Sequence, residues 1–209
     1  MSKFLIIRFS ALGDVAMSVP VIYSFAVQYP HHHITVWSRE AFRALFVSMP
    51  ENVSFIGADL KQRHKGIKGL IRLYKEQKKE SFDFIIDFHS VLRTQYLMFR
   101  FKLRGIKTIS IDKGRKEKKA LTRKSRKVFR PLKSSFERYK EALEKSGFPF
   151  DYSFHSIFEQ YPADFSEIVH LTGEKKKKWI GIAHFAKHKE KIYPQELMEQ
   201  VLVHFASDE

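Results

Sequence analysis

The sequence predicts an α/β fold built on a doubly wound parallel sheet. Short runs of β-branched and aromatic residues alternate with longer amphipathic stretches, and this order of strand, helix and strand is typical of such sheets. The expected strands are Lys3–Ile7, Ile34–Trp37, Val53–Ile56, Phe82–Asp87 and Ile106–Ile111. The expected helices are Val19–Gln28, Arg39–Met49, Ile67–Lys79 and Val91–Leu103. Ligands of these folds bind at the carboxyl ends of the strands, so the turns that follow the strands are the places to search.

The composition indicates a folded protein of a reducing compartment. Of the 209 residues, 44% are hydrophobic and 20 are Phe, which is enough apolar surface for a sizeable core. The absence of cysteine excludes disulfides and thiolate chemistry, and we expect a cytoplasmic protein. Arg8 interrupts the apolar N-terminal run, which makes that run a poor signal peptide, and no stretch is long enough to span a bilayer.

A strongly basic segment follows the last expected strand. Between Lys113 and Lys133 there are eleven lysines and arginines and a single acid, Glu117. Because so many like charges repel one another, we expect a solvated, mobile loop or a loosely formed helix. A regular helix, Ser134–Ser146, should follow and end at Gly147.

The end of the chain has the pattern of a second domain that has only begun. We expect a first Rossmann-like domain over residues 1–160, a linker over 161–178 and the truncated beginning of a second domain over 179–209. Pro162 and the run EKKKK favour the linker.

The last segment should hold a strand, Trp179–Ala183, and a helix from Pro194 to about Ala206. One strand and one helix cannot close a core, so this end of the chain should associate with itself or be poorly soluble.

The turn after the first strand places an acid where nucleotide-binding folds usually hold a phosphate. Neither G-x-G-x-x-G nor G-x-x-x-x-G-K-[ST] is present, and the turn has one glycine, Gly13, followed by Asp14. A carboxylate here suits either proton abstraction from a hydroxyl or capping of the next helix. Pro20 is tolerated only in the first turn of a helix, which predicts a helix start near Ser18 and a separate exposed turn over Gly13–Met17.

Three segments carry a resemblance to a known family. IIRFSALGDVAMSVP, at the start of the chain, resembles the N-terminal signature of the family 9 glycosyltransferases, the heptosyltransferase group of lipopolysaccharide inner-core synthesis. FDFIIDFHSVLRT, Phe82–Thr94, is similar to the family's strand that ends in Asp before a Leu-Arg helix. WIGIAHFAKHKEKIYP, Trp179–Pro194, resembles the opening of its second domain. The three lie in the family's order and span nearly the whole chain.

The resemblance implies a fold, an enzyme activity and a set of site residues. It implies a GT-B architecture and inverting transfer of a sugar, typically heptose from ADP-heptose, to a lipid A or core oligosaccharide acceptor. No metal and no cofactor besides the nucleotide-sugar donor are implied. Asp14 would be the general base on the acceptor hydroxyl, and Lys191 would offset charge on the departing diphosphate. The implied acceptor-binding residues are Arg8, Ser10, Gly13, Asp87 and Arg93, and the implied donor-binding residues are Lys187 and Lys191.

The sequence departs from the family's pattern in two places. His184, Phe185 and Ala186 stand where the family usually has Pro-Gly-Ala, and the later Asp-x-Gly-x-x-His segment has no counterpart up to Glu209. We therefore expect an acceptor half with little of the donor half, and a chain that is inactive alone.

Two further groups have competing interpretations. Asp87 and Arg93 could form an ion pair that steadies the loop after the fourth strand, or could contact the acceptor, with His89 between them as a weaker candidate. The run His31–His33 suggests a metal site, but adjacent residues of an extended chain point to alternate faces and do not converge on one ion.

The net charge of +15 predicts an anionic partner without identifying it. The basic segment could be only a solvated surface, or could attach the protein peripherally to the anionic inner face of the inner membrane. The rival class is a nucleic-acid-binding module, although no RNP, KH, helix-turn-helix or zinc pattern is present and no specific nucleic acid is expected. A third possibility is a non-catalytic remnant, or a subunit that another polypeptide completes.

Overall fold

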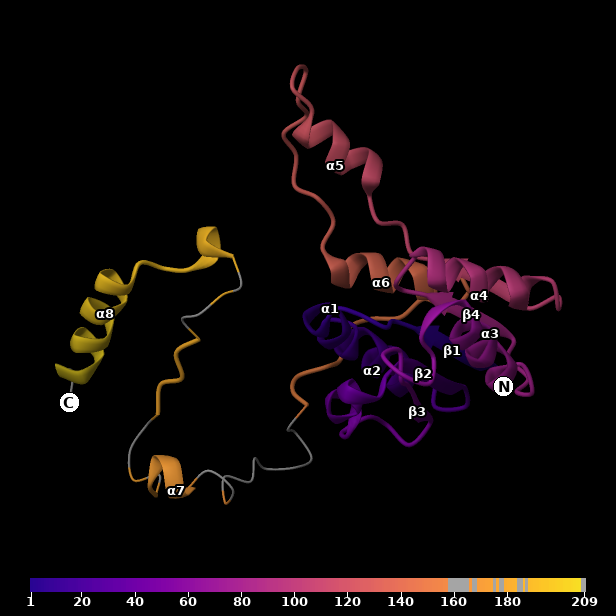
Figure 1. Cartoon of the computed structure of the whole chain (residues 1–209), viewed down its shortest axis with the longest axis horizontal. Coiled ribbons are helices and arrows are strands. Elements are labelled where there is room, and N and C mark those ends of the chain that lie inside the picture. The colour runs from indigo at the N-terminus through magenta and orange to yellow at the C-terminus, as the bar shows by residue number, and fades with distance from the viewer. Residues whose placement is uncertain are drawn as a thin grey trace. The chain divides into compact units, whose positions relative to one another are not determined.

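The computed structural model describes residues 1–157, 166, 169–174, 176, 179–183, 186 and 188–207. Contacts between Cα atoms divide the chain into two compact units, Met1–Pro162 and Ala163–Glu209. Each unit is described by itself below, and Figure 1 labels its elements.

The first unit is built on a five-stranded parallel sheet with the strand order β3-β2-β1-β4-β5. The strands are β1 Lys3–Ile7, β2 His33–Arg39, β3 Val53–Ala58, β4 Phe84–Asp87 and β5 Lys107–Ser110. The chain moves outward from β1 to β3 and then returns to the other side of β1 for β4. The strand order therefore reverses between β1 and β4, where Ile7 pairs with Asp87, and such a switch point is where α/β sheets bind ligands.

Both faces of the sheet are covered, which explains why β1 is apolar throughout. Phe4 and Ile6 join one buried cluster together with side chains of α2, Val19–Gln28, and α6, Ser135–Glu144. Leu5 and Ile7 join a second cluster with side chains of α3, Gly66–Gln77, and α4, Leu92–Lys102. A strand buried on both sides needs apolar residues at every position, so the predicted doubly wound sheet is confirmed.

The turn after β1 divides as Pro20 predicts. A single helical turn, α1 Leu12–Ala16, carries Asp14, and α2 begins separately at Val19 with Pro20 at its second position. Pro20 therefore lies where its missing N–H removes no helical hydrogen bond. The separate turn was predicted correctly, and it is itself helical.

Two segments of the first unit differ from the prediction. The expected helix Arg39–Met49 is a shorter 3₁₀ helix, η1 Glu40–Phe46, in which Arg43 Nε pairs with Glu40 Oε1 at 2.5 Å. Side chains three residues apart eclipse in a 3₁₀ helix, which suits this pair. The basic segment contains a regular helix, α5 Arg115–Thr122, rather than only a mobile loop.

The described part of the second unit is helical. It contains α7 Val169–Thr172, which falls within the expected linker, η3 Lys189–Lys191 and α8 Gln195–Ser207. The expected strand Trp179–Ala183 is wrong, because these residues have no regular structure and pair with no other strand in the described ranges. A strand is held by its neighbours, and this segment has none. No helix within the described residues has the length and apolar character needed to cross a membrane.

A close approach on α3 provides a test of the packing. A Cβ atom on Gly69 would lie 2.1 Å from the carbonyl carbon and 2.5 Å from the Cα atom of His64, both backbone atoms that a rotamer change cannot move. We expect Gly69→Ala to lower the free energy of unfolding by about 1–3 kcal/mol in urea titrations. Gly13→Ala is the matched control, since its Cβ would meet nothing within 4 Å. Equal stability of the two variants would contradict this packing.

Candidate functional site

The guanidinium of Arg8 organises the carboxyl end of β1. Its Nη1 donates to the carbonyl oxygen of Phe88 at 2.5 Å, and its Nη2 lies 2.5 Å from Oδ2 of Asp14. The backbone of Arg8 is fixed as well, because its N–H donates to the carbonyl of Trp37 and its carbonyl accepts from the hydroxyl of Ser38. Arg8 thus joins the ends of β1, β2 and β4 to the acid on α1.

Asp14 presents a carboxylate that is held on one side and open on the other. Its Oδ2 accepts from the N–H of Ala11 at 3.2 Å as well as pairing with Arg8, so the acid also caps the first turn of α1. The Asp14 side chain is 38% exposed, against 11% for Arg8. Oδ1 makes no hydrogen bond to any described residue. Gly13, beside it, is exposed and faces open space.

Helix α6 supports this turn from below. The hydroxyl of Tyr139 donates to the carbonyl oxygen of Asp14 at 3.2 Å, and the Tyr139 ring stacks on Phe88 with centroids 4.4 Å apart. Burial raises the pKa of Tyr139, so the hydroxyl keeps its proton and remains a donor. Sequence reasoning missed Tyr139, because its place in an amphipathic helix indicates only a core position.

Asp87, at the end of β4, is fully buried and folds the next loop around itself. Its Oδ1 accepts from the N–H groups of His89 at 2.8 Å and Ser90 at 2.9 Å. Burial raises the pKa of this carboxyl, and the loop N–H groups oppose that shift. The predicted ion pair with Arg93 is absent among the described residues, so that interpretation is wrong. The acid steadies the loop through backbone N–H groups, which reach it where the half-buried Arg93 on α4 does not.

His89 connects the β4 loop to the β1 loop. Its Nε2 lies 3.1 Å from the hydroxyl of Ser10, and its Nδ1 is buried without a partner among the described residues. Burial, together with the positive charges of Arg8 and Lys113, lowers the pKa of His89 to about 4. The ring is therefore neutral at neutral pH, and no proton on it competes with Arg8 for Asp14.

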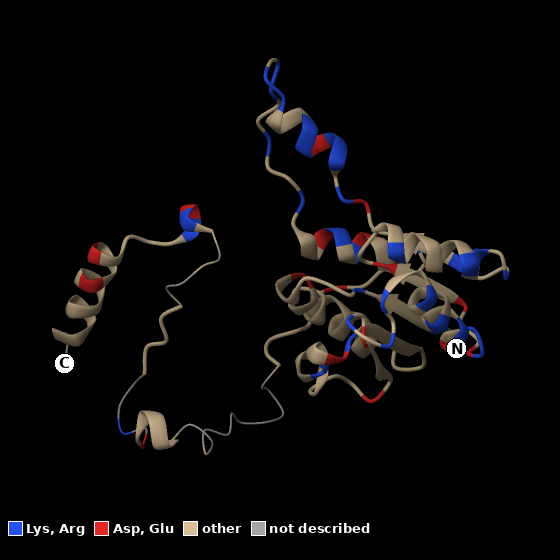
Figure 2. Cartoon of the chain, viewed as in Figure 1, with Lys and Arg blue, Asp and Glu red and all other residues tan. Residues whose placement is uncertain are grey.

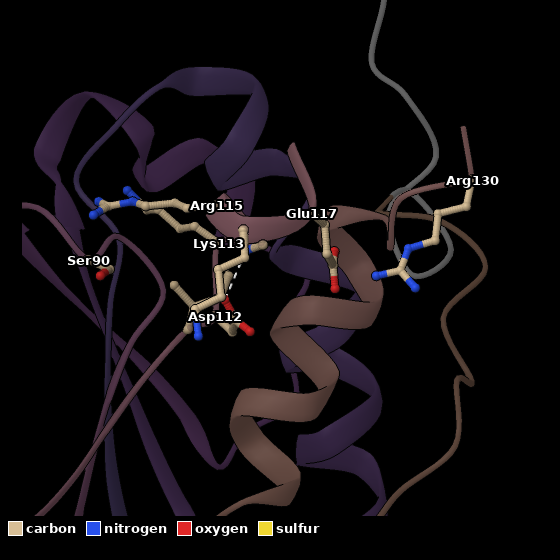
Figure 3. A pocket seen from close by; sticks show the side chains of 9 residues that line it. Ser90, Asp112, Lys113, Arg115, Glu117 and Arg130 are labelled. Atoms are coloured by element: carbon tan, nitrogen blue, oxygen red, sulfur yellow. Dashed lines mark hydrogen bonds between the residues drawn. The ribbon is translucent and has the colours of Figure 1, made fainter. Parts of the chain in front are cut away.

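A cationic cavity lies beside this cluster. Its volume is about 570 Å³, and Ser90, which follows His89, forms part of its wall. In Figure 3, Arg115 and Arg130 lie at opposite sides, with Lys113 and Glu117 between them. The lining residues are Ser90, Ile111, Asp112, Lys113, Gly114, Arg115, Lys116, Glu117 and Arg130.

The positive charge of this cavity is not neutralised by its own acids. Oδ1 of Asp112 accepts from the N–H of Gly114 at 2.9 Å, and Glu117 pairs with Arg138 at 2.8 Å. The four cations of the lining make no ion pair with any described residue; they are Lys113, Arg115, Lys116 and Arg130. Such a cavity is suited to an anion.

Lys113 couples the cavity to the Arg8–Asp14 pair. Burial lowers the pKa of Lys113, and the positive charges of Arg8 and Arg115 lower it further. The carboxylates of Asp87 and Asp14 act in the opposite direction. Because these charges act on one ammonium group, the cavity and the pair form one electrostatic site, and a bound anion would relieve the repulsion among its cations.

The other predicted residues lie apart from this cluster. Lys191 ends η3 in the second unit and is exposed, and Lys187 lies outside the described residues. The three adjacent histidines diverge: His31 is exposed, His32 stacks on Tyr29, and His33 lies 3.3 Å from the hydroxyl of Ser54. No group of three or more potential metal ligands occurs in the described part of the chain.

The lowered pKa of His89 predicts a pH dependence of stability. The unfolded chain protonates this ring near pH ~6.5, but the folded chain does so only at about pH 4. Stability due to His89 is therefore complete above pH ~6.5 and falls as the pH drops toward about 4.

His89→Gln keeps a partner for Ser10 but does not titrate. We expect the stability of the parent relative to this variant to fall by about 2–3 kcal/mol between pH ~7 and pH ~4 in urea titrations. Asp87 is present in both proteins and cancels. Parallel pH profiles would contradict a buried neutral His89.

Comparisons with known proteins show where this architecture occurs. No protein-family model matches the chain. A curated protein, the lipopolysaccharide core heptosyltransferase OpsX of Haemophilus influenzae, is 30% identical over 97 residues, which are 46% of this chain and 27% of that protein.

Solved structures share the fold over nearly the whole chain. The glycosyl transferase family 9 protein of Veillonella parvula aligns with a TM-score of 0.67 and 22% identity, over 98% of this chain and 60% of that one. Heptosyltransferase WaaC of E. coli, solved with ADP, aligns with a TM-score of 0.61 and 18% identity, over 98% of this chain and 65% of that one. The chain thus spans less than two thirds of these relatives. The likenesses confirm the α/β fold of GT-B type and the predicted resemblance of this chain to the N-terminal half of the family 9 glycosyltransferases.

Proposed function

We propose that this chain provides the acceptor-binding part of an inverting glycosyltransferase that transfers heptose from ADP-heptose to a lipopolysaccharide core acceptor. The observation that carries the proposal is the half-open carboxylate of Asp14 at the switch point between β1 and β4, next to a cationic cavity. The names of the relatives support the substrates, since OpsX is a lipopolysaccharide core heptosyltransferase and WaaC has been solved with ADP.

Asp14 is the proposed general base. With Oδ2 held by Arg8 and by the N–H of Ala11, Oδ1 is left to accept the proton of an acceptor hydroxyl. As that proton leaves, the hydroxyl oxygen attacks the anomeric carbon from the face opposite the diphosphate, and the bond from sugar to phosphate breaks. Inversion follows from this single displacement, and base assistance of this kind contributes about 10²–10⁴-fold to a rate.

The cationic cavity would hold the acidic groups of the acceptor. An inner-core acceptor carries phosphates or carboxylates, and the four unpaired cations of the cavity match that charge. Lys113 belongs both to the cavity and to the surroundings of Asp14, so an acid bound there would lie near the reacting hydroxyl. The acceptor is held first by charge and then oriented by Ser10 and Arg8.

The donor side of the proposal rests on the family resemblance. Lys187 and Lys191 would offset charge on the departing diphosphate, with no metal or further cofactor. The acceptor's lipid would bring the reaction to the cytoplasmic face of an anionic inner membrane, with this chain attached peripherally.

Replacing Asp14 tests the chemical step. We expect Asp14→Asn in the native protein to lower kcat by about 10²–10⁴-fold, because the amide cannot accept the proton. KM for a deacylated inner-core acceptor should change little. Asp151→Asn, an exposed acid on the same unit, is the matched control and should retain full activity. Full activity of Asp14→Asn, with an unchanged unfolding midpoint for both variants, would contradict the base assignment.

Neutralising the cavity tests acceptor binding separately. We expect Arg115→Gln/Lys116→Gln to weaken binding of the deacylated acceptor by about tenfold or more in calorimetric titrations, since each charge-assisted contact contributes about 1.5–3 kcal/mol. The control is Lys75→Gln/Lys79→Gln, which removes the same charge from the surface at α3. If both double variants lose affinity equally, the acceptor responds to net charge and not to the cavity.

A further inference from the structure

The basic segment forms an arm that projects from the first unit. We use "the arm" for residues 113–133, which comprise α5 and the loop that returns to α6. Figure 1 shows the arm extending beyond α6, and Figure 2 shows lysines and arginines along most of its length. Eleven of its residues are Lys or Arg, and only Glu117 is acidic.

The base of the arm is fastened by one buried arginine. Nη1 of Arg138 donates to the carbonyl of Asp112 at 3.1 Å and Nε donates to the carbonyl of Lys133 at 3.2 Å, which closes the two ends of the arm. Nη2 pairs with Glu117 on α5 at 2.8 Å. Gly114 fits against this guanidinium with φ +59°, and a Cβ there would lie 2.2 Å from Nη2. The arm is therefore held in a defined direction.

The charge of the arm is not compensated by the rest of the described chain. Lys133 pairs with Glu141, and the other ten cations make no ion pair with any described residue. Confining so many like charges to one projection is unfavourable in free solution and becomes favourable at an anionic surface.

The outer part of the arm also exposes apolar side chains. The N–H of Val128 donates to the carbonyl of Ala120 at 3.0 Å, which folds the return loop against the end of α5. Phe129 then stands 81% exposed and Val128 40% exposed, between Lys127 and Arg130. An aromatic ring surrounded by basic residues is the composition of surfaces that insert into the boundary between lipid headgroups and acyl chains.

We propose that the arm is a docking surface for an anionic lipid bilayer, in which its lysines and arginines bind headgroup phosphates and Phe129 inserts into the interface. Nucleic acid fits the charge equally well but not the aromatic pattern. Single strands are bound on a series of exposed rings, whereas the arm offers one ring, with aliphatic Val128 beside it. The inference extends the proposed function, but its test requires neither donor nor acceptor.

The test is binding of the full chain to vesicles in a flotation assay. Vesicles of phosphatidylcholine with phosphatidylglycerol are the anionic probe, and vesicles of phosphatidylcholine alone are the neutral one. We expect binding only to the anionic vesicles and a steep loss with added salt. Lys124→Gln/Lys127→Gln, away from the cavity, should weaken binding by about thirtyfold, at roughly fivefold for each basic residue.

Phe129→Ala isolates the apolar contribution. It should weaken binding by about tenfold at constant charge, and Phe99→Ala, which removes a 58% exposed ring from α4, should have no effect. Lys75→Gln/Lys79→Gln is the charge control. In Phe129→Trp, the emission from the new indole should shift to the blue on anionic vesicles, since the ring leaves water.

The outcomes separate the arm from its rivals. Equal losses in the two double lysine variants would overturn the proposal, since net charge alone would then explain binding. So would an unshifted indole, or a duplex or single-stranded RNA bound in preference to the vesicles with the same arm dependence. None of these results bears on transfer to a deacylated acceptor, so failure of the arm and failure of the transferase proposal are distinguishable.

Discussion

The whole site depends on where the guanidinium of Arg8 is held. β1 delivers it to the switch point of the sheet, the carbonyl of Phe88 fixes one nitrogen, and the carboxylate of Asp14 fixes the other. Because the side chain is mostly buried, breaking either contact would leave a charge without full compensation. One ion pair therefore sets the position of α1, the orientation of the acid and the approach of the β4 loop.

The surroundings of that pair explain how a lone carboxylate can act within a basic protein. Arg8 and Lys113 bring positive charge to the site, and burial together with these charges keeps His89 neutral. Asp87 is buried and spends its hydrogen bonds on the loop, so Asp14 is the exposed acid of this cluster. The same excess of cations continues into the cavity and along the arm, where Arg138 fixes its direction. Proton acceptance, anion binding and membrane attachment are thus proposed along one continuous basic surface.

Local patterns in the sequence predict most of the first unit. β1 and α2 begin and end where hydrophobic periodicity and Pro20 place them, and Arg8, Ser10 and Asp14 meet Asp87 because parallel strands end at one edge. Tyr139 and Lys113 were missed, since their contacts with the site join residues far apart in the chain. The Asp87–Arg93 pair and the strand Trp179–Ala183 were wrong for a related reason. Each depended on a neighbour that local sequence does not identify, a loop N–H in one case and a pairing strand in the other.

The most direct test of the account is a crystal structure of the native protein with a deacylated inner-core acceptor. The account predicts an acceptor hydroxyl about 2.6–3.2 Å from Oδ1 of Asp14. It also predicts an acidic group of the same ligand among Lys113, Arg115 and Lys116. An acceptor bound away from the β1 and β4 ends, with Asp14 contacting only Arg8 and the N–H of Ala11, would contradict it.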